Sequence, residues 1–235
     1  MRSATLSRTE MGGLLAGQLL AYTGSRTAVL LAIPPGGAAV AAAIAHRLNL
    51  PLQALPVRRL AAPGHPDVTL GAIAGANELA TNPRLQRIYS VPPAAFEKIV
   101  AAEREALARR EGRYRRGQPL DLKGLTAIVV DDAVVTGATM RAAIAAARAA
   151  GARRVIVTTP IMATSAYVEV RGEADAVVGQ RMARTVPPLA EFYAEHRDVS
   201  ESEALALLGG FPRSAQAAAP HAPHRQNSAA ACFTP

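Results

Sequence analysis

The chain is poor in the residues that build disulfide scaffolds, thiol sites and aromatic surfaces. Of its 235 residues only one is cysteine, Cys232; there is no tryptophan, and aromatic residues make up 4%. A single cysteine excludes an intramolecular disulfide and a metal site made of paired cysteines. Residues 1–11 show no basic start followed by an apolar core and a cleavage site, so we predict a cytoplasmic protein.

The chain also lacks an unbroken apolar helix long enough to span a membrane. No charge interrupts Ala28 to Ala45, which by length alone raises the question. The tetrapeptide Pro34-Pro35-Gly36-Gly37 lies in its middle and would break any helix there. A strand, a loop and a helix account for the segment better, and we predict no membrane association.

Acidic residues are outnumbered, because 26 lysines and arginines face 18 aspartates and glutamates, giving a net charge of +8. Such a balance suits an acidic substrate or nucleic acid. Part of the excess lies in one run: Arg109, Arg110, Arg113, Arg115 and Arg116. Basic residues near the end of a helix complement its dipole, and only Tyr114 lies among them, so a base-stacking surface is poorly supported. We therefore expect an anionic small molecule and no nucleic acid.

The order of apolar segments predicts an α/β fold, a three-layer doubly wound sheet of about five parallel strands. The expected strands are Thr27–Ile33, Pro51–Arg58, Leu125–Val130, Arg153–Ile161 and Ala174–Val178, and the expected helices Thr9–Tyr22, Gly37–Leu48, one from Pro92-Pro93 to near Arg110, Thr139–Ala150 and Thr164–Arg171. Residues 61–82 are punctuated by proline and glycine, with a short strand at Val68–Ile73, and we expect a small mobile flap or hood there.

The composition changes after Phe211 to Ala, Pro, His, Gln, Asn and Ser. Such a segment buries too little apolar surface to offset the entropy of ordering it. We therefore predict one domain over residues 1–211 and a disordered tail over residues 212–235. The sequence is compatible with a monomer or a homodimer.

The most informative segment runs from Ile128 to Thr139. A buried strand would deliver Asp131 and Asp132 at its carboxyl end, where open parallel sheets bind ligands. The turn that follows, Ala133-Val134-Val135-Thr136-Gly137-Ala138-Thr139, opens a helix whose free N–H groups favour an anion. The carboxylates can accept hydrogen bonds from sugar hydroxyls, and the turn four residues later can hold a phosphate. Together they suit a ribose 5-phosphate. The alternative is an ordinary strand-to-helix turn in which an Asp or Thr caps the helix.

This segment resembles the signature of type I phosphoribosyltransferases, a hydrophobic strand, two acids, a short spacer and Thr-Gly-x-Thr. More widely, residues 9–208 are similar to a bacterial group described as predicted phosphoribosyltransferases. That group has a first loop Leu-Pro-Arg-Gly-Gly and a second loop Val-Arg-Lys-Leu-Gly-Ala-Pro-Gly-Asn-Pro-Glu. Here these loops read Ile33-Pro34-Pro35-Gly36-Gly37 and Val57-Arg58-Arg59-Leu60 to Asp67, and Phe192-Tyr193 stands for the group's Trp-Tyr element.

The resemblance implies a phosphoribosyltransferase that binds 5-phosphoribosyl 1-pyrophosphate with Mg²⁺. Asp131 and Asp132 would take the ribose hydroxyls directly or through the metal, residues 133–139 the 5-phosphate, and the segment Pro35-Gly36-Gly37 with Arg58 and Arg59 the pyrophosphate. His65 would act as an acid or orient the leaving group, although a lone loop histidine more often faces solvent, and the two arginines could equally be solvated charges.

Pro35 departs from the group's arginine and removes both a cation and a backbone donor. Two other functions therefore stay open: a sensor that binds a phosphoribosyl compound without turnover, and a hydrolase with water as the acceptor.

Overall fold

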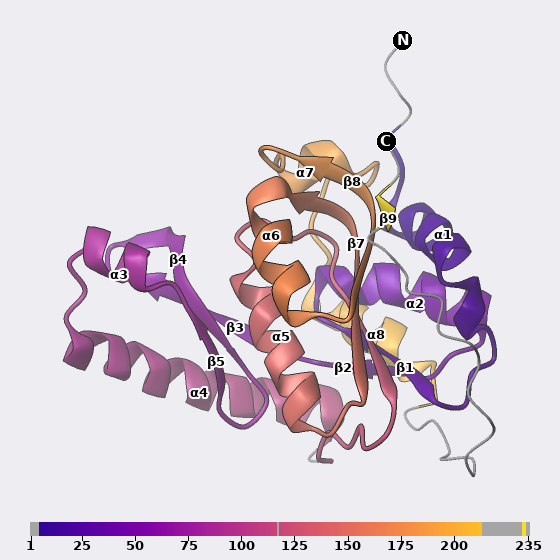
Figure 1. Cartoon of the computed structure of the whole chain (residues 1–235), viewed down its shortest axis with the longest axis horizontal. Helices are drawn as coiled ribbons and strands as arrows, with labels where there is room; N and C mark the ends of the chain where they lie inside the picture. Colours follow the sequence, from indigo (N-terminus) through magenta and orange to yellow (C-terminus); the bar gives the residue numbers. More distant parts are fainter. Residues whose placement is uncertain (1–4, 117, 213–231, 234–235) are drawn as a thin grey trace.

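The computed structural model describes residues 5–116, 118–212 and 232–233. Its centre is a parallel sheet in the order β2-β1-β6-β7-β8-β9 (Figure 1). The strands are β1 (Ala28–Ala32), β2 (Leu52–Ala54), β6 (Thr126–Val130), β7 (Arg154–Ala163), β8 (Ala176–Ala183) and β9 (Cys232–Phe233). The five longer strands confirm the predicted sheet. The sixth, β9, pairs with Val178 and Gly179 of β8.

Helices cover both faces of this sheet because successive strand side chains point to opposite sides. One face carries α1 (Arg8–Gln18), α2 (Gly36–Leu48) and α8 (Glu201–Gly209), packed on buried residues such as Leu30 and Ile128. The other carries α5 (Ala138–Ala149) and α6 (Thr164–Glu173), packed on Val29 and Val129. The fold is therefore the predicted three-layer α/β structure. In the part of the chain described, no helix is long and apolar enough to cross a membrane.

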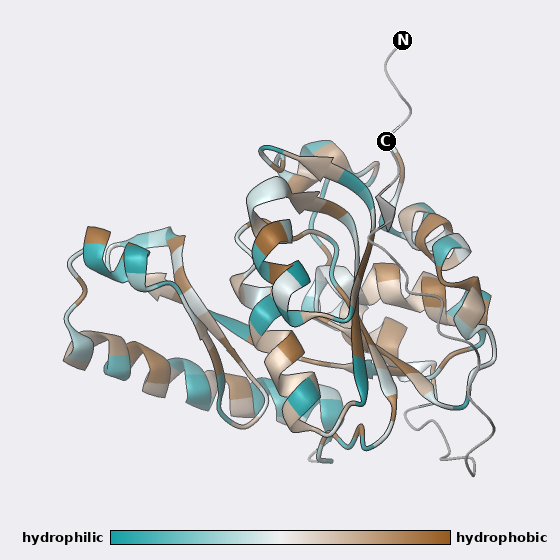
Figure 2. Cartoon of the chain, viewed as in Figure 1, coloured by the Kyte–Doolittle hydropathy of each residue, from teal (hydrophilic) through white to brown (hydrophobic). Residues whose placement is uncertain are grey.

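A second, antiparallel sheet forms the flap that extends to the left in Figure 1, in the order β3-β4-β5. Its elements are β3 (Val57–Ala62), β4 (His65–Ala74), β5 (Glu78–Thr81), α3 (Pro83–Ile88) and α4 (Pro93–Arg115). Helix α4 is amphipathic (Figure 2), and its Val100 and Leu107 pack on Leu60 and Ile73 of the sheet. The predicted loop-rich flap is thus a sheet backed by a helix.

The predicted strand Pro51–Arg58 was wrong as a single element. Residues 52–54 form β2 of the parallel sheet, whereas β3 begins at Val57 in the flap. Pro56 stands between the two strands, and a proline cannot donate a hydrogen bond to a ladder, which favours a break there. The arginines that follow consequently belong to the flap.

The C-terminal part holds two short helices. Of their residues, only the Phe192-Tyr193 pair, which lies at the end of the first helix, was singled out from the sequence. Helix α7 (Leu189–Phe192) contains half of the Phe192-Tyr193 pair, and both rings are buried against Ile161. Helix α8 begins after Ser200, whose hydroxyl accepts from the Glu203 amide in a capping box. The prediction of a disordered tail falls on residues 213–231 and 234–235, which lie outside the described residues; the two described residues near its end form β9.

Candidate functional site

The first loop, the acidic pair and a third loop, residues 133–139, meet at the carboxyl ends of β1 and β6, which are neighbours in the sheet. The first loop leaves β1, where the Ile33 amide donates to the Val130 carbonyl at 2.9 Å. The acidic pair Asp131-Asp132 follows directly after β6. The third loop returns to the sheet at Val134, which forms a bridge with Met162 of β7. The structure thus brings the first loop, the acidic pair and the Thr136–Thr139 turn to one sheet edge.

The two carboxylates of the pair are held differently. Asp131 Oδ1 accepts from the Asp132 amide at 2.9 Å, and Asp132 Oδ2 accepts from Arg8 Nε at 2.9 Å. Burial raises the pKa of Asp131, and the charge of Asp132 raises it further; burial also raises the pKa of Asp132, although Arg8 opposes this shift. No group of three or more His, Cys, Asp or Glu side chains that could hold a metal occurs among the described residues.

Arg8 is the site residue that sequence reasoning missed. It is 1% exposed, lies 4.2 Å from the centroid of the Tyr193 ring, and donates from Nη1 to the Arg197 carbonyl at 3.0 Å. Tyr193, fully buried, donates its hydroxyl to the Asp132 carbonyl at 2.6 Å. Both residues therefore fix the position of Asp132.

A signal for Arg8 is present in the sequence. Ser7 and Glu10 form a capping box, which makes Arg8 the first residue of α1. A cation is unfavourable at a helix N-terminus because of the dipole there, so an arginine at this position needs a compensating partner. The sequence does not show that this partner is Asp132, 124 residues away.

The glycines of the first loop leave room for the acidic pair. A Cβ built on Gly36 would lie 2.0 Å from Asp132 Oδ2, and one on Gly37 would lie 2.6 Å from the Val130 carbonyl oxygen. The Gly37 amide already donates to the Ile33 carbonyl at 3.1 Å, so it is not free for a ligand. Glycine is therefore required at positions 36 and 37 because the loop lies so close to the acidic pair and to β6, and not because the Gly37 amide binds a ligand.

We expect Gly36→Ala to displace the Asp132 carboxylate and, if this edge binds 5-phosphoribosyl 1-pyrophosphate as the resemblance implies, to weaken that binding about tenfold or more. Overpacking of this kind also costs about 1 to 3 kcal/mol of unfolding free energy. Gly17→Ala in α1 is the matched control, because a Cβ there meets nothing within 4 Å. Calorimetric titration and chemical denaturation measure both effects. A Gly36→Ala protein that matches the Gly17→Ala protein in affinity and stability would contradict this role of Gly36.

The third loop, residues 133–139, ends at the start of α5. Gly137 is the residue before the helix, with φ +79°, and no side chain caps the helix start. Thr136 is exposed and Thr139 is half-buried, and the first N–H groups of the helix have no partner within it. Val134 is 3% exposed and its amide donates to the Ile161 carbonyl, so this residue supports the loop from the core.

The predicted residues of the second loop lie in the flap. Arg58 Nε donates to Glu103 of α4 at 2.6 Å, while Arg59, the next residue of β3, is exposed. His65 begins β4 at the end of the flap far from the parallel sheet (Figure 1). Its ring is exposed and packs edge-on against Tyr89, with 5.0 Å between the ring centroids. The structure therefore does not bring His65 to the acidic pair.

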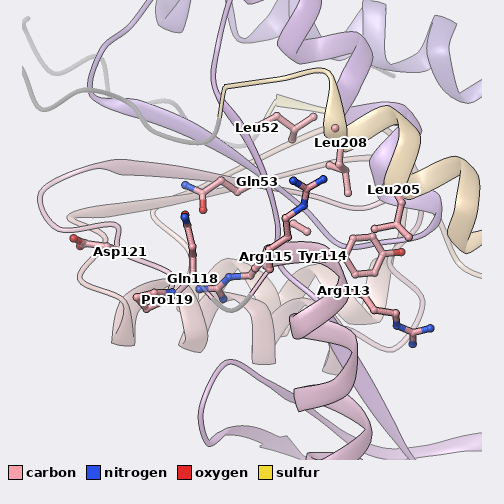
Figure 3. A pocket seen from close by; sticks show the side chains of 13 residues that line it. Leu52, Gln53, Arg113, Tyr114, Arg115, Gln118, Pro119, Asp121, Leu205 and Leu208 are labelled. Carbon is pink, nitrogen blue, oxygen red and sulfur yellow. The ribbon is translucent and has the colours of Figure 1, made fainter.

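Two cavities of the described part of the chain lie away from the acidic pair. One, of about 510 Å³, lies between β2, the end of α4 and α8 (Figure 3). Its wall combines the apolar side chains of Leu52, Leu205 and Leu208 with arginines from the end of α4. Three arginines of the predicted basic run, Arg113, Arg115 and Arg116, thus line a hollow at the edge of the sheet.

Comparison with known proteins agrees with this arrangement of loops. A family model described as the phosphoribosyl transferase domain matches residues 10–181. The chain belongs to this family. The match includes the first loop, the acidic pair and the Thr136–Thr139 turn, and it confirms the resemblance drawn from these residues.

Individual relatives are similar over most of the chain. Two Mycobacterium tuberculosis proteins, from strains CDC 1551 and H37Rv, are named provisionally as phosphoribosyl transferases and are each 34% identical over 202 residues, or 86% of this chain. The chain spans only 45% of the length of each. The crystal structure of TT1426 from Thermus thermophilus is 32% identical, with a TM-score of 0.71, over 89% of this chain and all of TT1426.

Proposed function

We propose that this phosphoribosyltransferase-family protein binds 5-phosphoribosyl 1-pyrophosphate together with Mg²⁺ and transfers the phosphoribosyl group to an acceptor. The supporting observation is the meeting of the acidic pair, the Gly36-Gly37 loop and the Thr136–Thr139 turn at one edge of the parallel sheet. Ligands of open α/β sheets bind at this edge.

The two carboxylates take different parts in this proposal. Asp132 is already paired with Arg8, so Asp131 is the better placed to accept from a ribose hydroxyl or to bind the metal. Carboxylate oxygens fit Mg²⁺, which proteins hold through one or two carboxylates together with substrate phosphates, where it neutralises developing charge. The start of α5 would hold the 5-phosphate through its N–H groups and Thr139.

Thr139→Val removes one phosphate donor at nearly constant volume. We expect the affinity for ribose 5-phosphate to fall by about 1.5 to 3 kcal/mol, the contribution of a hydrogen bond to a charged group. Thr164→Val, at the start of α6, is the control because its hydroxyl donates to the Ala183 carbonyl and not to the site. Equal affinity of wild type and Thr139→Val in calorimetry would mean that the phosphate is not held by this hydroxyl.

A sensor that binds the donor without reacting is the second candidate. Two observations favour it: Pro35 offers neither a cation nor an amide donor at the first loop, and the charge of Asp132 is already compensated by Arg8. A sensor would retain donor affinity and show no turnover.

Release of pyrophosphate from isotope-labelled donor distinguishes these functions. With Mg²⁺ and a panel of purine and pyrimidine bases, a transferase releases pyrophosphate only when its acceptor is present and forms a labelled nucleotide. Release without any base, together with free ribose 5-phosphate, indicates a hydrolase. Binding without release indicates the sensor. Absence of binding would contradict the proposal in every form.

A further inference from the structure

The first loop carries no charge of its own. Its sequence, Ile33-Pro34-Pro35-Gly36-Gly37, contains no basic or acidic side chain, and Gly36 lies against the carboxylate of Asp132. Helix α2 begins at Gly36 without a side-chain cap, so the positive end of its dipole lies at the loop. A helix end supplies only about half an elementary charge. A loop that binds pyrophosphate therefore needs a cation from another segment.

Arg110 of α4 lies against this loop. Its Nη2 donates to the Pro34 carbonyl at 3.3 Å, across 76 residues of sequence. The Arg110 side chain is 14% exposed. Because little water surrounds the guanidinium, its charge is screened less than the charge of a surface arginine. The helix of the flap thus brings a positive charge to the first loop.

The charge of Arg110 is only partly neutralised by the protein. Arg110 Nε and Arg113 Nη2 each lie 3.5 Å from the same oxygen, Glu201 Oε1, so two guanidinium groups share one carboxylate. Arg110 Nε and Glu201 Oε1 are also buried atoms without a hydrogen bond. Two positive charges against one negative charge leave an excess of positive charge beside the loop.

Two other arginines near the sheet edge differ from Arg110 in this respect. Arg8 Nε lies 2.9 Å from Asp132, and Arg58 Nε lies 2.6 Å from Glu103. These distances are close to those of charge-assisted hydrogen bonds, so each of these two cations already has a carboxylate of its own. Arg110 combines contact with the first loop, low exposure and a shared counter-ion.

We propose that Arg110 supplies the positive charge of the first loop and binds the pyrophosphate group of the donor there. This inference rests on the proposed function, because it assigns a ligand group of the same site. Nη2 carries two hydrogens, so it can donate to the Pro34 carbonyl and to a phosphate oxygen at the same time. The bond to the phosphate is charge-assisted, about 2.7 to 2.9 Å long, and stronger than the 3.3 Å contact with the carbonyl.

Calorimetric titration of the full chain with pyrophosphate and Mg²⁺ tests this role through two opposite changes. Arg110→Met should weaken binding about tenfold, and Arg104→Met, an exposed arginine of the same helix, is its control. Glu201→Gln removes the shared carboxylate and should strengthen binding several-fold. Its control is Glu105→Gln, because the Glu105 side chain is 77% exposed. A gain of affinity in Glu201→Gln cannot result from damage to the fold.

A rescue variant and a second ligand complete the test. Pro35→Arg added to Arg110→Met returns a cation to the loop and should recover part of the lost affinity for pyrophosphate. Ribose 5-phosphate should bind wild type and Arg110→Met equally, because it has no pyrophosphate group.

The proposal is overturned if wild type does not bind pyrophosphate, or if Arg110→Met matches Arg104→Met. It is also overturned if Glu201→Gln gains nothing over Glu105→Gln, if Pro35→Arg recovers nothing, or if Arg110→Met loses ribose 5-phosphate affinity to the same extent. Wild type that binds neither ribose 5-phosphate nor 5-phosphoribosyl 1-pyrophosphate would contradict the proposed function itself. Binding of these two ligands with no effect of Arg110→Met on pyrophosphate would contradict only the role of Arg110.

Discussion

Arg8→Met is expected to lower the free energy of unfolding by about 3 to 5 kcal/mol, the usual cost of removing one partner from a buried ion pair. The change leaves the buried Asp132 carboxylate without its cation, and it also removes the contact with the Tyr193 ring. Burial then acts on Asp132 without the opposing charge of Arg8, so the pKa of Asp132 should rise further. Urea denaturation measures the first effect and carboxyl NMR the second.

Two further variants separate the ion pair from a general loss of packing. Arg8→Met combined with Asp132→Asn should recover part of the lost stability, because no unpaired charge remains buried. Arg141→Met removes a more exposed arginine that pairs with Glu169 and Glu173, and it should cost at most about 1 kcal/mol. If Arg8→Met were no more destabilising than Arg141→Met, Arg8 would not hold Asp132 in solution.

The sequence was sufficient to predict those parts of the site whose residues are adjacent in the chain. A five-residue apolar strand, two acids and a Thr-Gly-Ala-Thr turn are adjacent in the chain, so their order on the sheet edge follows from strand and helix geometry. The first loop could be placed for the same reason, since it joins β1 to α2.

The parts that the sequence could not supply depend on contacts between distant segments. Arg8 and Tyr193 reach Asp132 from opposite ends of the domain, and no periodicity encodes that meeting. The division between β2 and β3 is a tertiary effect as well, because the apolar run continues across it and only Pro56 marks the change of sheet. For the same reason Arg58 was expected at the edge of the parallel sheet, whereas it pairs with Glu103 in the flap.

The second large effect is expected at Asp131. The described structure shows no ion pair for Asp131, so Asp131→Asn keeps the Oδ1 acceptor for the Asp132 amide and removes only the charge. Asp132→Asn, in contrast, would leave Arg8 buried without its charged partner. A loss of ligand affinity in that variant could then result from unfolding as well as from the missing carboxylate. Asp131→Asn is therefore the sharper variant for the proposed donor site.

Calorimetric titration of wild type and Asp131→Asn with 5-phosphoribosyl 1-pyrophosphate, with and without Mg²⁺, tests the central claim most directly. Asp121→Asn, an exposed aspartate before β6, is the control with the same change of charge. We predict Mg²⁺-dependent binding by wild type and Asp121→Asn, and an affinity lower by about tenfold to a hundredfold in folded Asp131→Asn. Equal, metal-independent affinity in all three proteins would contradict the assignment of the acidic pair to the donor site.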